Sequence, residues 1–175
     1  MSVARIMTIG HSTKTAEEFV ALLEAHGVTG VADVRTIPRS RRHPHFSRES
    51  LIVLLGERGI AYHHFPALGG LRKPRPDSGN GGWRHESFRG YADHMESAEF
   101  REAIERLLVF AQKFFTAVMC AESKWWQCHR RVLADAMLAR GSEVRPTMSA
   151  GEAPPHELTP FAKVAGSHVS YPGLV

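Results

Sequence analysis

Short apolar runs alternate with segments of helical periodicity along most of this chain, and this alternation constrains the fold more than any other feature. Three runs have the length of a strand, Arg5–Ile9, Val28–Val34 and Phe114–Cys120, while Ile60–Phe65 is a weaker one and Glu143–Met148 is the candidate for a fifth strand. Between them, apolar residues recur every three or four positions, as in a helix that buries one face. This rhythm is typical of an α/β fold with right-handed crossovers. We therefore predict a Rossmann-like three-layer domain, with a mostly parallel sheet of about five strands and helices on both faces.

Capping and turn residues mark where the elements begin and end. Thr15 followed by Glu18 has the spacing of a capping box, and Ser47 is a candidate cap for the next helix. Glycine and proline crowd residues 66–90, which we expect to be a loop insertion. Residues 150–175 are expected to form an irregular C-terminal tail. We treat residues 1–175 as one α/β domain.

The composition fits a protein with one core and no membrane segment. The chain has 175 residues, of which 43% are hydrophobic and 23% are charged. No apolar run approaches the roughly 18 residues of a membrane span. The first ten residues lack the features of a secretory signal. We expect a cytoplasmic protein with no membrane partner, and we expect both cysteines to be thiols.

Polar side chains follow the predicted strands where their carboxyl ends meet, which is the edge at which open α/β sheets bind ligands. The catalytic candidates from this set are His11, Glu122, Cys128 and His129. The candidate ligand-binding residues are Ser12, Asp33, Arg35, Ser40, Arg41, Gly69, Gly70, Cys120 and Arg130.

The helix that opens at Cys128 carries the sharpest hypothesis. The free amides of a first helical turn favour negative charge, so a thiol placed there has a lowered pKa. His129 and Arg130 add donors that suit a phosphate or a carboxylate. The functional interpretations are an anion pocket or an activated cysteine. The structural interpretation is a buried thiol beside an exposed arginine.

Four other candidates have structural alternatives. Asp33 next to Arg35 indicates a buried ion pair. His11 follows the first strand at a tight turn, where we favour a role in the site. Glu122 either accepts a proton or pairs with a nearby arginine. Cys120 ends an apolar strand and is read as a core thiol or as part of a pocket wall.

Positive charge is concentrated in the middle of the chain. Residues 35–89 contain 11 Lys and Arg against 4 Asp and Glu, and five of the 11 histidines. This imbalance predicts a phosphate-bearing ligand, or a nucleic acid bound without catalysis, as partner. A solvated basic loop is the third interpretation.

Metal binding is the remaining alternative. Neither His43 and His45 nor His63 and His64 have the spacing of a helical zinc motif, and the cysteines are eight residues apart. We predict no cofactor and no metal site. A metal or redox site that uses Cys128 is kept as an alternative.

Several short motifs follow one another in the order of a known family. They include Gly10-His11-Ser12, Asp33-Val34-Arg35, Gly59-Ile60-Ala61-Tyr62, Leu68-Gly69-Gly70, Trp83, Cys120-Ala121-Glu122, Cys128-His129-Arg130 and Leu158-Thr159-Pro160-Phe161-Ala162. Together they resemble the family called domain of unknown function 488. The resemblance implies a compact α/β fold with these motifs around one pocket, and it adds Tyr62 and Trp83 to the ligand-binding candidates. It implies no activity. One departure is that the family often has a Val-x-His-Ile pattern where this chain reads Val144-Arg145-Pro146-Thr147-Met148.

The leading hypothesis is an enzyme, a hydrolase or transferase, that acts on a nucleotide or a nucleic-acid end. Arg35, Arg41, His129 and Arg130 would hold the anion, and Ser12 and Ser40 would donate hydrogen bonds to it. His11 or Glu122 would move protons. Cys128 would be a nucleophile, a metal ligand or an anion-facing thiol.

Overall fold

The predicted parallel sheet is present in the computed structural model, which describes residues 3–173. Its strands are β1 (Arg5–Gly10), β2 (Gly30–Asp33), β3 (Ala61–His64), β4 (Thr116–Cys120) and β5 (Glu143–Pro146). Their order is β3-β2-β4-β1-β5, and every pairing among them is parallel. Strand β4 therefore lies between β1 and β2, with Cys120 opposite Gly10 and Met119 opposite Asp33.

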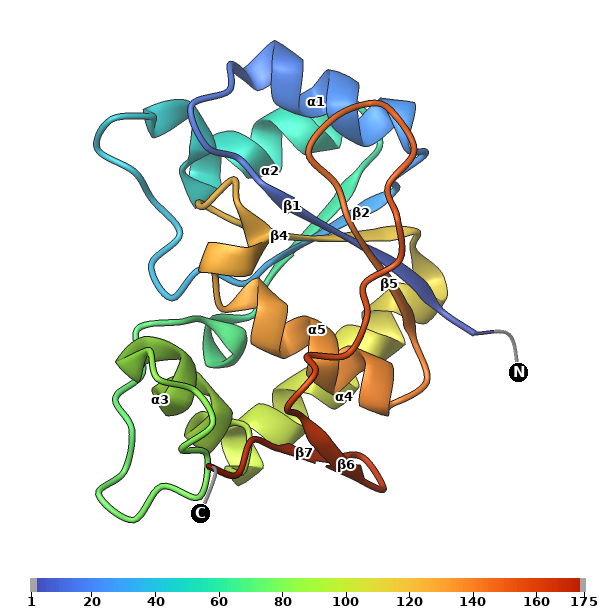
Figure 1. The fold of residues 1–175 in the computed structure, drawn as a ribbon. Coiled ribbons are helices and arrows are strands. Elements are labelled where there is room, and N and C mark those ends of the chain that lie inside the picture. Colours follow the sequence, from blue (N-terminus) through green and yellow to red (C-terminus); the bar gives the residue numbers. More distant parts are fainter. Residues whose placement is uncertain (1–2, 174–175) are drawn as a thin grey trace.

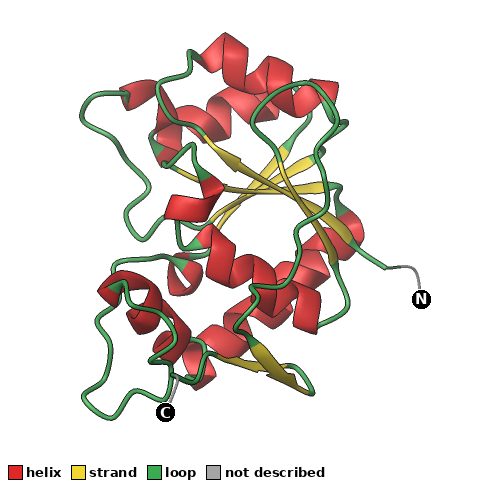
Figure 2. Cartoon of the chain, in the orientation of Figure 1, coloured by secondary structure: helices red, strands yellow, loops and turns green. Residues whose placement is uncertain are grey.

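Helices cover both faces of the sheet and complete three layers (Figures 1 and 2). The helices are α1 (Ala16–Ala25), α2 (Arg48–Glu57), α3 (Glu86–His94), α4 (Ala98–Lys113) and α5 (Arg130–Ala139), with short 3₁₀ helices η1 (Pro44–Phe46), η2 (Pro66–Leu68) and η3 (Trp125–Gln127). Helices α1 and α2 lie on one face, and α4 and α5 lie on the other (Figure 1). Across residues 3–173, no helix is both long enough and apolar enough to pass through a bilayer.

Neighbouring residues of each strand point to opposite faces and so supply two cores. In β1, Ile6 packs in the core beneath α4 and α5, whereas Met7 packs in the core beneath α1 and α2. In β4, Val118 and Ala117 divide in the same way. Burial on both faces explains why these strands read as continuous apolar runs in the sequence.

The predicted helix caps are confirmed. The Thr15 hydroxyl accepts a hydrogen bond from the Glu18 amide at 3.1 Å, and the Glu18 carboxylate accepts one from the Thr15 amide at 2.9 Å. The Ser47 hydroxyl accepts one from the Ser50 amide. Both caps satisfy first-turn amides that would otherwise lack partners.

Two segments that we expected to be irregular contain regular structure. Helix α3 begins at Glu86, inside the predicted loop, because its apolar side buries Tyr91 completely in the core. The tail contains an antiparallel hairpin of β6 (Lys163–Ala165) and β7 (His168–Ser170). Gly166 adopts a φ of 63° in its turn, a conformation that glycine accepts without strain.

Candidate active site

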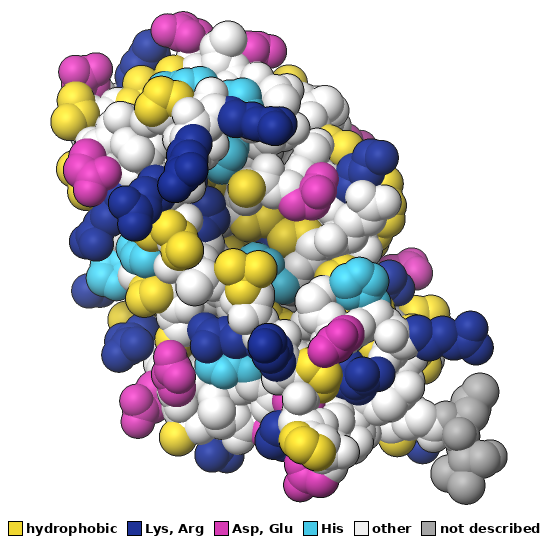
Figure 3. Space-filling model, turned by 90° about the vertical axis from the view of Figure 1, so that its left-hand side faces the viewer, with side chains coloured by type: hydrophobic (Ala, Val, Ile, Leu, Met, Phe, Trp, Pro, Cys, Tyr) yellow, Lys and Arg dark blue, Asp and Glu magenta, His cyan; other side chains and the backbone are white. Residues whose placement is uncertain are grey.

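A cavity of about 430 Å³ lies at the carboxyl ends of β1, β2 and β4, and we call it the strand-end cavity. It is lined by His11, Arg35, Thr36, Ile37, Arg39, Ser40, Gly70, Leu71, Ser87, Phe88, Cys120, Ala121, Glu122, Gln127, Cys128 and His129. Figure 3 faces this side of the molecule, and Lys and Arg side chains gather along one margin of the view. The topology explains the assembly, because β4 carries Cys120 between the strands that lead into His11 and Arg35.

The two cysteines meet in the wall of the strand-end cavity. Both are buried free thiols, and their Sγ atoms are 2.9 Å apart. Cys120 is held by the end of β4, and Cys128 directly precedes the His129 cap of α5. The amide of Arg130 donates to Cys128 Sγ at 3.5 Å, so the first turn of the helix faces this sulfur.

His129 is oriented toward the same sulfur. Its Nδ1 lies 3.6 Å from Cys128 Sγ, and its Nε2 lies 3.2 Å from the Val34 carbonyl oxygen. A carbonyl only accepts, so Nε2 carries a hydrogen and Nδ1 is free to exchange a proton with the thiol. Nucleophile, base and orienting group therefore follow one another, as in enzymes that use an activated cysteine.

The surroundings favour the thiolate form of Cys128. A hydrogen bond from Cys120 is the main cause that lowers the pKa of Cys128, and the contact and charge of His129 and the charge of Arg130 add to it against the effect of burial. Burial raises the pKa of Cys120, and the hydrogen bond to Cys128 raises it further. The two pKa shifts are opposite in direction, so the environment favours the thiolate on Cys128 and the proton on Cys120.

Arg35 is held in a fixed orientation by a buried carboxylate. Its Nε and Nη2 donate to the two oxygens of Asp33 at 2.9 and 2.7 Å, and the Tyr62 hydroxyl donates to the same carboxylate. Burial alone would lower the pKa of Arg35, but the Asp33 hydrogen bond and charge raise it. The predicted Asp33–Arg35 ion pair is confirmed, with both side chains buried. This geometry leaves Arg35 Nη1 without a hydrogen-bond partner.

His11 is a neutral imidazole with one unused nitrogen. Its Nδ1 lies 3.0 Å from the Ser12 carbonyl oxygen, and its ring stacks on Phe46 at 4.4 Å. Burial lowers the pKa of His11 to about 4. Because Nδ1 donates to the carbonyl, the lone pair is on Nε2, which is buried and has no partner.

Arg130 lies beneath the cavity and does not line it. Its side chain is fully buried, and Nη2 donates to the carbonyl oxygens of Glu122 and Ser123. The Glu122 carboxylate lies at the exposed surface and accepts from the Lys124 amide, and it forms no ion pair with Arg130 or Arg35. Arg130 therefore holds the loop that follows β4, while Glu122 lines the rim.

The remaining candidates divide between the cavity wall, its support and other surfaces. Ser40, Gly70 and Cys120 line the cavity together with the four catalytic candidates and Arg35. Asp33 and Tyr62 support Arg35 from below, Ser12 accepts from His11, and Gly69 packs against Thr36. Arg41 is exposed and lies outside the lining. Trp83 is packed among Phe88, Phe161 and Tyr171.

Some lining residues were missed from the sequence. They are Thr36, Ile37, Arg39, Leu71, Ser87, Phe88, Ala121 and Gln127. Thr36, Ile37 and Arg39 extend the segment after β2, so their position next to Arg35 was a usable signal. Ser87 and Phe88 come from α3, whose existence the sequence analysis did not predict. Within residues 3–173, no three His, Cys, Asp or Glu side chains are grouped as a metal site requires.

Comparison with known proteins gives one match. The family model described as "Domain of unknown function DUF488" matches residues 15–137. No curated protein and no solved structure matches the chain. The matched segment contains Arg35, Cys120, Cys128 and His129, and His11 precedes it.

Proposed function

This chain belongs to the DUF488 family, and we propose that it is an enzyme that binds a phosphate-bearing ligand in the strand-end cavity and attacks it through Cys128. One observation carries the proposal. Arg35 has a fixed guanidinium with a free Nη1, and it lines the same cavity as the Cys128 sulfur and the His11 ring. A nucleophile beside unsatisfied polar groups is the arrangement that enzymes of phosphoryl or acyl transfer require.

We assign Arg35 as the side chain that binds the phosphate of the ligand. Asp33 occupies Nε and Nη2, so Nη1 is the remaining donor. A buried donor without a partner costs about 1–3 kcal/mol, and an oxygen of the ligand would remove that cost. Phosphate fits better than a neutral group because hydrogen bonds between charged partners are roughly twice as strong.

Cys128 is the nucleophile in this proposal. The Cys128 thiolate, whose proton His129 Nδ1 has taken, attacks phosphorus as the bond from phosphorus to the leaving oxygen breaks. The imidazolium proton of His129 then goes to the leaving oxygen. The product of this step is a phosphocysteine and a free alcohol or phosphate.

His11 completes the cycle by activating water. Its Nε2 has a lone pair and no partner, so it can accept a proton from a water molecule that attacks the phosphocysteine. The sulfur–phosphorus bond breaks, the thiolate is restored and phosphate leaves. A second alcohol in place of water would make the same chain a transferase.

Binding and turnover of nucleotides test the proposal. Calorimetry with inorganic phosphate and nucleoside monophosphates measures binding, and phosphate release from nucleotides and 5′-phosphorylated oligonucleotides measures turnover. We expect Arg35→Lys to weaken phosphate binding at least about tenfold, because a hydrogen bond to a charged group contributes about 1.5–3 kcal/mol. We expect Cys128→Ser to keep binding and to lose turnover about a thousandfold or more.

The matched control is Arg58→Lys. Arg58 is an exposed arginine at the end of α2, and it pairs with Glu24 of α1. This variant should bind phosphate as the wild type does. Thermal melting separates a binding loss in Arg35→Lys from unfolding. Failure of the wild type to bind any of these phosphates, or full turnover by Cys128→Ser, would contradict the proposal.

The exposed arginines after β2 favour a second candidate, which is nucleic-acid binding without catalysis. Arg39, Arg41 and Arg42 are exposed in the segment that follows Arg35. A surface of this kind binds phosphates along a backbone, and its affinity falls steeply with salt. Oligonucleotides with a 5′-phosphate and with a 5′-hydroxyl distinguish the two functions. A steep salt dependence with no preference for the phosphorylated end favours the second function.

A further inference from the structure

We propose that Cys120 and Cys128 are a site of reversible oxidation, at which a hydroperoxide oxidises Cys128 and Cys120 closes an intramolecular disulfide. The juxtaposition of the two sulfurs at 2.9 Å in the wall of an open cavity carries the inference. This site does not depend on the phosphate chemistry proposed above.

The two cysteines need little movement to bond. A disulfide has sulfurs about 2.05 Å apart, so closure requires a shift of under about 1 Å. Cys120 is held by β4, and residues 121–127 join it to Cys128. The side chains of Glu122, Trp126 and Gln127 in that connection are exposed, and Arg130 holds its backbone at Glu122 and Ser123, so the shift is expected mainly in the two cysteine side chains.

Both sulfurs are reachable by a small oxidant. Cys120 and Cys128 line the strand-end cavity, whose volume of about 430 Å³ is many times that of hydrogen peroxide. A bulky thiol reagent has poorer access, since both side chains are largely buried. The geometry therefore favours hydroperoxides over protein disulfides as the oxidant.

The structure distinguishes the attacking cysteine from the resolving one. Cys128 receives the Arg130 amide and the His129 ring, and both stabilise a thiolate. Cys120 Sγ contacts only Cys128 Sγ and the Glu122 carbonyl oxygen as hydrogen-bond partners within residues 3–173, so no cation there stabilises a thiolate on it by contact. Cys128 is therefore the sulfur that attacks the peroxide, and Cys120 is the resolving sulfur that then attacks the oxidised Cys128.

The chemistry balances in two steps. The Cys128 thiolate attacks one peroxide oxygen, the O–O bond breaks, and Cys128 becomes a sulfenic acid while the other oxygen leaves as water or alcohol. Cys120 then attacks the Cys128 sulfur, the S–O bond breaks, and the oxygen leaves as water. The dithiol loses two electrons and two protons, and the peroxide gains them. A thiol reductant reverses the change.

Oxidation would remove the nucleophile from the cavity. Once Cys128 is bonded to Cys120, no lone thiolate faces the ligand, and His129 loses its partner. Any reaction that uses Cys128 would therefore stop until the disulfide is reduced.

The chain has only these two cysteines, which makes the experiment direct. Purified protein is treated with stoichiometric hydrogen peroxide, and its intact mass and free thiols are measured under denaturing conditions. We expect both thiols to disappear, the mass to fall by two hydrogen atoms, and dithiothreitol to restore both values. The protein should remain a monomer on a non-reducing gel.

The single variants assign the roles. In Cys120→Ser the Cys128 sulfur should remain as a sulfenic acid that dimedone traps, and in Cys128→Ser the remaining thiol should resist the same dose of peroxide. Circular dichroism verifies that each variant is folded, and the wild-type mass measurement does not depend on either variant. Addition of oxygen without loss of hydrogen, a disulfide-linked dimer, or unreactive wild-type thiols would each overturn the proposal.

The phosphate assays keep this result separate from the proposed function. If the disulfide forms and no phosphate binds, the proposed redox site is supported and the proposed phosphate-binding enzyme is rejected. If phosphate is turned over and peroxide leaves the thiols intact, the reverse holds.

Discussion

His129 reaches Cys128 because the residue facing its ring has no side chain. A Cβ atom at Gly70 would lie 2.9 Å from His129 Nδ1, closer than ordinary carbon contacts allow. On another side, the ring of Tyr91 lies 5.1 Å from the ring of His129. The imidazole therefore occupies a slot between Gly70 and Tyr91 that keeps Nδ1 beside the sulfur.

Substitution of Gly70 by alanine should raise the pKa of Cys128 and so make its thiolate form less stable. The added methyl group displaces Nδ1 from the sulfur, so one cause of the low pKa of Cys128 is lost. We expect the midpoint of iodoacetamide alkylation against pH to move to higher pH than in the wild type. Gly79→Ala is the control, because a Cβ there meets nothing within 4 Å. Equal midpoints in the wild type and Gly70→Ala would show that His129 does not stabilise the thiolate.

The sequence identified the residues of the Cys128 motif but did not resolve which way each side chain points. Arg130 was assigned to the ligand, yet it turns inward to backbone carbonyls, and its neighbour Arg131 lies 5.0 Å over the Trp83 ring. Adjacent arginines look alike in a sequence. Their orientations depend on where α5 begins, which is a tertiary property. His129 was placed correctly at the helix start, although its contact with the Val34 carbonyl comes from a segment 95 residues away.

At the scale of elements, α5 anchors the C-terminal tail through one buried carboxylate. Asp135 accepts from His156 Nε2 at 2.8 Å, from the Thr159 amide at 3.1 Å and from the Tyr171 hydroxyl at 2.7 Å. The proximity of this carboxylate also raises the pKa of Tyr171, for which burial is the larger cause. The tail is thus tied to the same helix whose first turn faces Cys128.

Removal of the Asp135 carboxylate should release the tail. In Asp135→Ala three donors lose their acceptor, and each orphaned buried group costs about 1–3 kcal/mol. We expect the free energy of unfolding in urea to fall by about 3 kcal/mol or more, and trypsin to cut after Lys163 sooner. Glu157→Ala, at an exposed acid of the tail, should change neither value. If the Asp135 variant keeps wild-type stability, the tail is held by other contacts.

The elements that the sequence missed are short and polar. Helix α3 follows a glycine- and proline-rich loop, but Phe88, Tyr91, Ala92 and Met95 have helical spacing and were a usable signal. Hairpin β6–β7 has three-residue strands, and Val169 is their only residue in the core. Packing against α5 rather than local pattern stabilises it. The central strands β1, β2 and β4 were predictable because burial on both faces leaves a nearly continuous apolar run, whereas the edge strands β3 and β5 are only partly buried and carry histidine or charged residues.

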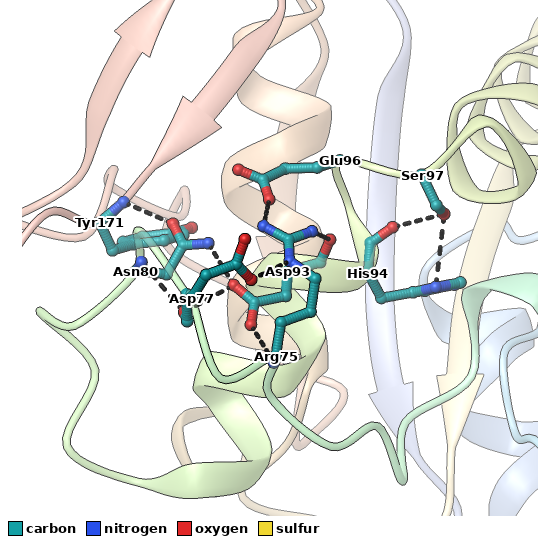
Figure 4. A network of polar contacts seen from close by, with 9 residues as sticks. Arg75, Asp77, Asn80, Asp93, His94, Glu96, Ser97 and Tyr171 are labelled. Carbon is teal, nitrogen blue, oxygen red and sulfur yellow. Dashed lines mark hydrogen bonds and ion pairs between the residues drawn. The ribbon is translucent and has the colours of Figure 1, made fainter.

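At the scale of the whole molecule, one network ties the long loop after η2 to the helices and to the tail (Figure 4). The Asp93 carboxylate accepts from Asn80 Nδ2 at 2.7 Å, from the Ser78 hydroxyl at 2.7 Å and from the Arg75 amide at 2.8 Å. Asn80 in turn accepts from the Tyr171 amide at 2.9 Å. Figure 4 shows Asp93 of α3 beside the loop residues Arg75 and Asn80, and Asn80 connects this acceptor to Tyr171 of the tail.

The Asp93 network should lose its contribution to stability in acid. Burial alone would raise the pKa of Asp93, but its hydrogen bonds from Asn80, Ser78 and Arg75 lower it. A carboxyl with a lowered folded pKa stabilises the fold above its unfolded pKa of about 3.9, and this contribution disappears as the pH falls through the folded value. At pH 7 we expect Asp93→Ala to lower the free energy of unfolding by about 2–3 kcal/mol.

Urea unfolding at pH 7 and below pH 4 checks this prediction. The difference in the free energy of unfolding between the wild type and Asp93→Ala should become smaller at the lower pH, where the wild-type carboxyl becomes protonated. Asp77→Ala is the matched control, because this acid of the same loop is highly exposed and its ion pair with Arg75 contributes little. A difference that stays constant with pH would mean that the charge of Asp93 is not what the network requires.

The place of β4 in the sheet also sets when the strand-end cavity can form during synthesis. Strands β1 and β2 leave the ribosome first, but they are not neighbours, and the strand that fills the gap between them is made some eighty residues after β2. Until β4 inserts, the facing edges of β1 and β2 have unpaired backbone groups, which can form hydrogen bonds with other strands or chains. The insertion that joins β1 to β2 also brings Cys120 to the rim, so the pair of thiols cannot assemble before the centre of the sheet is complete.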